Sequence, residues 1–263
     1  MIRRDLPSGG DGAAEQWLLV TQPDHARVSW ELAKAWDNAE FATLVCPADQ
    51  PGHELASVRA ELLEAIRCHD DGWIGYADAL LIDAEGRPLS FTEMPPDAAQ
   101  AIWTASIEAC RAIGPLAGWV VASHFYSLQA GRDADYPQWV GWLESVDQLR
   151  TGWLDEWRQA SPHHLTELAD RCLVWLQAFD WMSLWLCCVC PITEGDEAAE
   201  PMTTGGPEAG WRPLRFVADK CREPVRVTPW PFKTAELTLS VDARLGSIEG
   251  AASKLSWRLV PSE

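Results

Sequence analysis

Basic side chains are scarce in this chain of 263 residues. Lys and Arg together number 21 against 39 Asp and Glu, so the formal net charge at pH 7 is −18. A protein with this excess of negative charge repels phosphate backbones and anionic lipid surfaces. We therefore expect no nucleic-acid partner and no binding to a membrane surface.

The motifs of several common enzyme classes are missing as well. The chain has no GxGxxG or GxxxxGK[ST] element, which removes the usual sequence grounds for a dinucleotide site or a P-loop nucleotide site. It also has no GxSxG, so Ser123 and Ser127 beside His124 do not form the nucleophile elbow of a serine hydrolase.

Two further absences concern the cellular compartment. The eight cysteines lack the regular spacing of a disulfide scaffold, and Cys187, Cys188 and Cys190 form CCxC instead of paired CxxC zinc motifs. The basic start MIRRDLPSGG is not followed by the apolar segment of a signal peptide. We expect reduced, mostly buried thiols and a cytoplasmic protein.

One apolar stretch, CLVWLQAFDWMSLWLCCVCPI, is long enough to raise the question of a membrane span. It contains a single charged side chain, Asp180, in 21 residues. About 20 apolar residues can cross a bilayer, but a central Asp costs roughly 2.5 to 3.5 kcal/mol on insertion scales. Because no second span exists, the stretch is predicted to be a buried helix.

Apolar side chains that recur every three or four residues predict helices in most of the first 192 residues. The predicted helices cover about 21–36, 54–69, 97–113, 115–128 and 136–157, with a long helix that starts at Ser161 or Pro162 and includes the apolar stretch. Turn residues between about 75 and 96 predict a loop with a short hairpin.

The pattern changes after Pro191. Residues 193–210 are acidic, rich in Gly and Pro and without apolar periodicity, which predicts a flexible loop. Short alternating runs after it predict antiparallel strands. The sequence thus predicts a mainly α protein, with a helical domain at 1–192, a flexible acidic loop at 193–210 and a small antiparallel β appendage at 211–263 packed on the helical core.

Polar side chains interrupt the apolar stripes of four predicted helices. His25, His69 and His124 each lie on such a stripe, Asp70 follows His69, and Asp180 lies in the apolar stretch. A buried carboxylate without a partner costs several kcal/mol, and a divalent ion would satisfy imidazoles and carboxylates together. We predict a site for one or two ions of Mn, Fe, Zn or Mg, although each His taken singly is more often a hydrogen-bonded core residue.

The order of these residues resembles a known superfamily. One His, an adjacent His-Asp pair and a distant Asp on a later helix are typical of the HD-domain metal-dependent phosphohydrolases, with His25, His69, Asp70 and Asp180 at the matching positions. The fuller set QPDHA, HDDGW, SHF, FDWMSL and PWPF resembles the bacterial family of unknown function DUF3891 over nearly the whole chain.

The HD resemblance implies an HD-like helical bundle in which four residues hold one divalent ion. Binuclear members of the superfamily add histidines between the His-Asp pair and the last Asp. His124 is then the natural extra ligand, and His163 or His164 would have to supply a second one.

The function that the resemblance implies is hydrolysis of a small phosphate ester or nucleotide, in which the ion activates water. Asp70 and His124 are the candidate catalytic residues, Asp70 as a bridge between two ions and His124 as a second-site ligand or a proton donor to the leaving group. Arg27, Arg67 and Arg132 lie near the motifs in sequence as candidate positive charges.

Two other functions fit the same residues. Some HD-type proteins are di-iron oxygenases with the same ligand types. Alternatively, the polar cluster belongs to a non-enzymatic module, in which it fixes the packing of four helices or binds a small metabolite.

Overall fold

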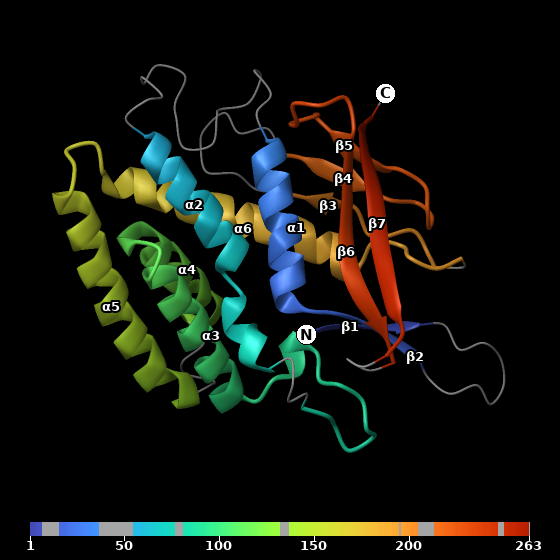
Figure 1. Ribbon diagram of the computed structural model, residues 1–263, viewed down its shortest axis with the longest axis horizontal. Coiled ribbons are helices and arrows are strands. Elements are labelled where there is room, and N and C mark those ends of the chain that lie inside the picture. Colours follow the sequence, from blue (N-terminus) through green and yellow to red (C-terminus); the bar gives the residue numbers. More distant parts are fainter. Residues whose placement is uncertain are drawn as a thin grey trace.

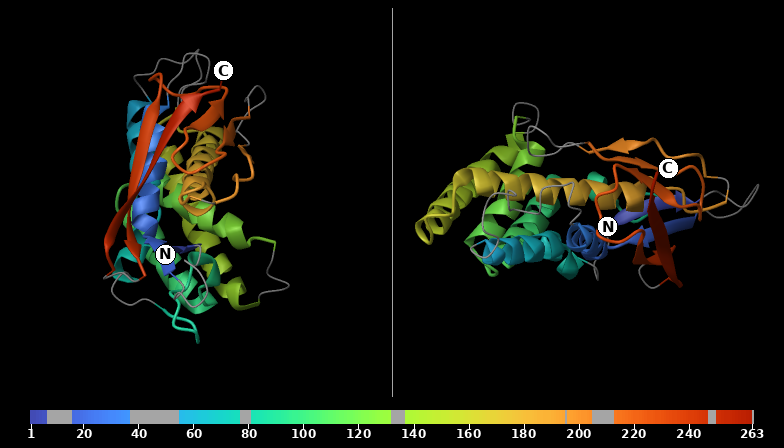
Figure 2. Two further views of the ribbon diagram at one scale, coloured as in Figure 1. Left: turned by 90° about the vertical axis from the view of Figure 1, so that its right-hand side faces the viewer. Right: turned by 90° about the horizontal axis from the view of Figure 1, so that it is seen from above.

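The structure of the protein is a computed structural model that describes residues 1–6, 16–36, 55–76, 81–131, 137–194, 196–204, 213–246 and 250–262. A group of helices lies beside a mixed β-sheet (Figure 1). Viewed from the side and from above, the sheet lies at one end of the helical group, next to α1 and α6 (Figure 2).

The described residues form six α-helices close to the predicted ranges. They are α1 (Gln22–Ala35), α2 (Ala56–Cys68), α3 (Pro96–Arg111), α4 (Pro115–Gln129), α5 (Val140–Gln159) and α6 (Thr166–Cys188). Three short 3₁₀ segments connect them, η1 (Asp71–Tyr76), η2 (Phe91–Glu93) and η3 (Pro137–Trp139). The last α-helix starts at Thr166, a few residues later than predicted.

Local signals determine where α1 and α4 begin. Thr21 caps α1, because its side chain accepts a hydrogen bond from the backbone N–H of Asp24 at 3.1 Å. The start of α4 is capped from another helix, since Glu61 of α2 accepts from the backbone N–H of Ala117 at 3.0 Å. A Cβ at Gly114 would meet the Glu61 Oε1 atom at 2.1 Å, so a side chain there would displace the capping carboxylate.

In the described part of the chain, seven strands form one sheet in the order β1-β2-β6-β7-β5-β4-β3. Their bounds are β1 (Ile2–Leu6), β2 (Gln16–Val20), β3 (Met202–Thr203), β4 (Arg215–Val217), β5 (Val225–Thr228), β6 (Leu237–Leu245) and β7 (Ala252–Pro261). The sheet is mixed, because β5 and β7 run parallel whereas the other neighbouring pairs are antiparallel.

The predicted fold class, a mainly α bundle with a small C-terminal antiparallel appendage, is wrong. Two N-terminal strands belong to the sheet, and β2 joins it by pairing Leu18 with Leu245 and Leu19 with Arg244 of β6. The run QWLLV is too short for periodicity to distinguish a strand from another buried segment. Its partner strand lies more than 200 residues away, so local sequence carries no signal of the pairing.

The helices and the sheet share a continuous apolar core. Trp36 at the end of α1 contacts Trp175 and Phe179 of α6 and Phe232 of the β5–β6 connection, with ring centroids 5.0 to 6.0 Å apart. These contacts hold α1 and α6 together against the sheet, and the two helices carry two of the predicted site residues.

Within the predicted acidic loop, residues 202–203 form β3, which pairs with β4. Residue 195 and residues 205–210 lie outside the described residues. The flexibility of the loop and the division of the chain at residues 192 and 211 stay predictions.

The apolar stretch around Asp180 forms most of α6. Leu176, Phe179 and Met182 are fully buried in the core, and Cys172 and Cys187 are buried free thiols. Among the described helices, α6 included, none combines the length and the apolar character that crossing a membrane requires.

Candidate metal centre

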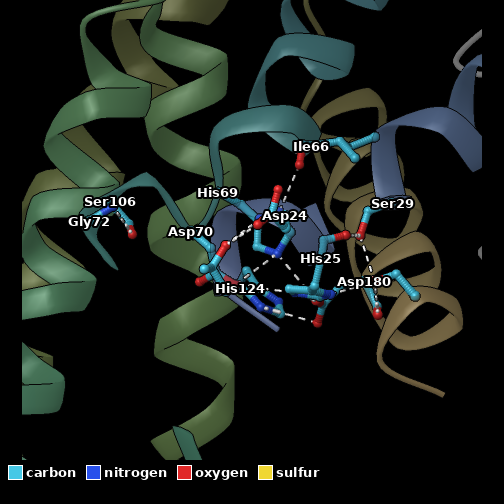
Figure 3. A network of polar contacts seen from close by, with 12 residues as sticks. Asp24, His25, Ser29, Ile66, His69, Asp70, Gly72, Ser106, His124 and Asp180 are labelled. Carbon is cyan, nitrogen blue, oxygen red and sulfur yellow. Dashed lines mark hydrogen bonds and ion pairs between the residues drawn. The ribbon is translucent and has the colours of Figure 1, made fainter. Parts of the chain in front are cut away.

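Five predicted site residues converge from four parts of the fold. His25 lies in the first turn of α1, His69 and Asp70 follow the last residue of α2, His124 lies on α4 and Asp180 on α6. Figure 3 shows their side chains pointing toward one another. His25 and His69 are each 1% exposed and Asp70 is 5% exposed, so the cluster lies inside the protein.

The two buried histidines and the two carboxylates surround one point. His25 Nε2 lies 3.2 Å from Asp70 Oδ2 and 3.2 Å from Asp180 Oδ1. His69 Nε2 lies 3.5 Å from the same Asp70 oxygen and 3.2 Å from the same Asp180 oxygen. One nitrogen of each ring and one oxygen of each carboxylate therefore share a small volume.

A backbone carbonyl determines the tautomer of His69. Its Nδ1 atom lies 2.7 Å from the carbonyl oxygen of Ile66, which accepts only, so Nδ1 carries a proton. In the neutral ring, Nε2 then presents a lone pair to the oxygens of Asp70 and Asp180. Two electron-rich groups at this distance need a proton or a metal ion between them.

Hydroxyl groups orient His25 from its other side. His25 Nδ1 lies 2.6 Å from Ser183 Oγ, and Ser183 Oγ lies 2.7 Å from Ser29 Oγ. Ser183 also donates to the carbonyl oxygen of Asp180 at 2.8 Å. With its proton directed there, Ser183 accepts from His25 Nδ1, which leaves His25 Nε2 free to face the carboxylates.

The pKa values of the two histidines and the two carboxylates reflect these close contacts. Burial lowers the pKa of His69, but the charge of Asp70 and the hydrogen bond with Asp180 outweigh burial and raise it to about 9. Burial also lowers the pKa of His25, and its bonds to both carboxylates reverse that effect and raise it. In Asp70 and Asp180 burial raises the pKa, but the neighbouring histidines lower it overall. The cluster thus stabilises anionic carboxylates next to a positive charge.

His124 occupies a different position at the edge of the cluster. Its Nε2 atom lies 3.6 Å from Asp180 Oδ2, the carboxylate oxygen that does not face His25 and His69, and its Nδ1 atom is buried without a hydrogen-bond partner. Burial lowers its pKa, so the ring is neutral at pH 7. His124 therefore directs Nε2 at the cluster, and its Nδ1 atom stays buried on the far side of the ring.

A protein-family model matches the part of the chain that contains this cluster. The family described as "Protein of unknown function (DUF3891)" matches residues 11–246, about nine tenths of the chain. The chain belongs to this family. The chain matches no curated protein and no solved structure.

All five cluster residues lie inside the DUF3891 match. His25, His69 and Asp180 form a group whose ligand atoms all lie within 4.8 Å of one another, which is compatible with a metal ion. Asp70 is not part of this group, but its Oδ2 atom lies 3.2 Å from His25 Nε2 and 3.5 Å from His69 Nε2. The structure therefore brings together His25, His69, Asp70 and Asp180, with His124 adjacent.

Other predicted residues of the DUF3891 protein lie elsewhere. His163 and His164 precede α6, whereas Asp180 lies fourteen residues after its first residue, about 21 Å along the axis at 1.5 Å per residue. Neither histidine can therefore be a second ligand to the ion that Asp180 would bind. Arg132 lies outside the described residues.

Arg27 and Arg67 do not reach into the cluster. Arg27 pairs with Glu31 at 3.1 Å, and Arg67 pairs with Glu64 at 2.9 Å. Both arginines therefore bind acidic residues of their own helices.

The sequence analysis missed Ser183 and Ser29. Ser183 follows Asp180 by three residues, and Ser29 follows His25 by four, so each lies on the same helical face as a cluster residue. This spacing was the available signal. Their contact with each other depends on the packing of α1 against α6, which the sequence does not show.

Proposed function

We propose that this DUF3891 protein is a metal-dependent hydrolase of the HD type, with a divalent ion held by His25, His69, Asp70 and Asp180. The observation that carries the proposal is the spacing of four ligand atoms. Each nitrogen-to-oxygen distance is 3.2 to 3.5 Å. Ligand atoms about 2.1 Å from a tetrahedral ion lie about 3.4 Å apart, which is close to these nitrogen-to-oxygen distances, and His25, His69 and Asp180 form the group whose ligand atoms all lie within 4.8 Å of one another.

The tautomer of His69 supports the same assignment. Metal-bound histidines usually donate their other N–H group to a carbonyl or carboxylate, which orients the ring. The Ile66 carbonyl does this for His69, and Ser183 is placed to do it for His25. Both rings are thus oriented before any ion binds.

When bound, the ion would supply an activated water by lowering its pKa toward neutrality. The chain itself contributes the ligands and a neutral His124 beside them. His124 Nε2 faces Asp180 at 3.6 Å, so this nitrogen would exchange a proton with the reacting groups at the site. Asp70, whose Oδ2 atom lies 3.2 Å from His25 Nε2 and 3.5 Å from His69 Nε2, would hold the ion together with the two rings.

The HD-type assignment rests on the order of His25, His69-Asp70 and Asp180 along the chain and on their convergence. Hydrolysis of a phosphate ester, which the HD resemblance implies, stays a prediction. Arg27 and Arg67 do not support it, because their guanidinium groups bind Glu31 and Glu64.

Elemental analysis of protein purified without added metal tests the proposal. We expect at least one Mn, Fe, Zn or Mg ion per chain, which chelation removes and reloading restores together with hydrolysis of bis-p-nitrophenyl phosphate or p-nitrophenyl acetate. Substoichiometric metal that none of the four ions restores would contradict the assignment.

The same preparation separates the two rival functions. Stoichiometric iron with oxygen consumption would favour the di-iron oxygenase. A non-enzymatic module has one observation in its favour: protons satisfy the cluster without metal, since the pKa values of His25 and His69 are raised. Unchanged folding and unchanged biological function after chelation would favour that module.

A further inference from the structure

A cavity of about 290 Å³ lies between the start of α1, the segment η1 and residues 81–94. Most of its walls are apolar, and they are formed by Met1, Pro23, Trp73, Ile74, Tyr76, Leu81, Leu89 and Met94. A cavity of about 150 Å³ between apolar side chains is large enough to hold benzene. This cavity therefore has room for an apolar group about twice that size.

A hairpin forms the outer wall of the cavity. Leu81 and Leu89 lie opposite each other in it, and the backbone N–H of Leu89 donates to the carbonyl oxygen of Leu81 at 2.8 Å. Arg3 of β1 holds the hairpin, because its guanidinium donates to the carbonyl oxygen of Pro88 at 2.7 Å. The wall is thus in place before a ligand arrives, which lowers the free-energy cost of binding.

The polar side chains of the cavity do not select one kind of head group. Thr21 donates to the carboxylate of Asp24 at 2.7 Å, and Arg27 pairs with the same carboxylate at 3.7 Å. The side-chain oxygen of Gln22 is buried, whereas Gln22 and Tyr76 also carry N–H and O–H donors. Acceptors and donors are both present, so the distinguishing property of the cavity is its apolar surface.

The cavity lies beside the metal cluster. Asp24 in the cavity wall directly precedes His25 of the cluster, in the first turn of α1. On the other side, the backbone N–H of Trp73 donates to the carbonyl oxygen of Asp70 at 3.0 Å. A group in the cavity is therefore held next to the turns that carry His25 and Asp70.

The apolar walls extend to the protein surface. Ile74 is 59% exposed, and Leu81 is 39% exposed. Both side chains lose contact with water when an apolar group covers them, which favours binding in proportion to the apolar area buried. A small polar molecule would leave most of this area exposed.

We propose that this cavity binds the apolar group of the substrate, a hydrocarbon chain or ring of about six to eight carbon atoms. The polar end of the substrate then lies toward the start of α1, where Thr21 and Asp24 form the polar part of the wall. Recognition depends on the apolar body, whatever the head group. The inference rests on the proposed function only where it makes the bound molecule the substrate of the metal centre.

Two homologous series of probes test the inference, the n-alkyl alcohols and the n-alkyl phosphates from butyl to decyl. Calorimetry on chelator-treated protein measures their affinities without metal. In both series we expect the affinity to rise about fourfold with each methylene and to level off near the octyl chain, because the cavity is then full. Affinities that do not depend on chain length, or that rise without a plateau to decyl, would overturn the inference.

Three variants locate the binding. Leu89→Trp fills part of the cavity and should shift the plateau to shorter chains. Ile74→Asp places a charge at the mouth and should weaken octanol binding about tenfold or more. Ile113→Asp is the matched control, because Ile113 is 40% exposed after α3 and does not line the cavity, and its affinity should equal that of the wild type. Equal effects of the two aspartate variants, or an unchanged plateau in a folded Leu89→Trp protein, would refute the site.

The link to the metal centre has a separate measurement. Mn-loaded protein is tested on p-nitrophenyl alkanoates and alkyl p-nitrophenyl phosphates, and kcat/KM for the hydrolysed series should level off at the same chain length as binding. Hydrolysis that does not depend on chain length would overturn the substrate assignment and leave the metal centre standing. If the metal-free protein binds the chains but no ion binds, the proposed function fails and the cavity stands as a binding site.

Discussion

His69 and His164 begin from the same local arrangement and end in different environments. Each places Nδ1 2.7 Å from a backbone carbonyl oxygen, that of Ile66 for His69 and that of Trp157 for His164. The ring of His164 then stacks on Trp157, with centroids 4.2 Å apart and planes 4° from parallel. The ring of His69 instead directs Nε2 at two buried carboxylates.

The comparison of His69 with His164 shows that a fixed ring orientation is not sufficient for a histidine to bind a metal ion. Both rings have a fixed tautomer, but the carboxylates that converge on His69 come from the adjacent Asp70 and from Asp180 on α6. His164 lies before that same helix, far from the residue that would complete a site. The difference arises from tertiary packing, and four experiments test it.

The largest effect is expected from His69→Asn compared with His164→Asn. An Asn amide can still donate where Nδ1 did, but it lacks Nε2. His69→Asn should therefore lose at least about 100-fold in affinity for Mn or Zn, more than loss of an outer-shell partner costs. His164→Asn should bind as the wild type does. Metal titration by calorimetry measures both, and equal affinities would remove His69 from the ligand set.

The second test is the pH dependence of stability without metal. In the folded protein the pKa of His69 is raised from 6.5 to about 9, so folding stabilises the protonated ring. This contribution is complete below about pH 6.5 and is lost as pH rises through about 9. Its size is on the order of 3 kcal/mol, since one pKa unit corresponds to about 1.36 kcal/mol.

Urea unfolding under chelator at pH 6, 7.5 and 9 measures this loss. His69→Asn should flatten the profile between pH 6.5 and 9, whereas His164→Asn should retain it. A wild-type profile without a decline across this range would show that the cluster does not hold the extra proton.

Ser183→Ala tests the support of His25. The substitution removes the oxygen 2.6 Å from His25 Nδ1 and should weaken metal binding about 10- to 100-fold, as for other outer-shell partners. Ser145→Ala is the control, because that exposed hydroxyl on α5 bonds only its own helix at 2.9 Å. Identical metal affinities for the two variants would mean that Ser183 does not orient the ligand.

The smallest effect is expected from alanine substitutions at two glycines, one in the turn after Asp70 and one in α5. A Cβ at Gly72, two residues after Asp70, would meet the carbonyl oxygen of Ile102 at 2.1 Å, whereas a Cβ at Gly152 in α5 meets nothing within 4 Å. Gly72→Ala should cost about 1 kcal/mol or more. Gly152→Ala should gain up to about 1 kcal/mol from helix propensity. Thermal melts compare them, and tolerance of Gly72→Ala would show that the turn after the cluster is loosely packed.

The helices and most of the site could be predicted because both leave local signals. The period of three to four residues located α1 to α6, and polar residues on those apolar stripes identified His25, His69, Asp70, His124 and Asp180 as candidates. Ser183 had a weaker signal, its spacing of three residues from Asp180. A hydroxyl on a helical face has many ordinary roles, so spacing alone did not select it.

The sequence by itself determined which faces are apolar, which polar side chains interrupt them and how negative the protein is, because these properties depend on residue identity and local spacing. Tertiary structure alone decided that β2 pairs with β6, more than 200 residues away, and that Ser29 and Ser183 meet beside His25. Strand partners and the environment of a second imidazole nitrogen depend on residues remote in sequence. Those residues come into contact only when the apolar faces pack together.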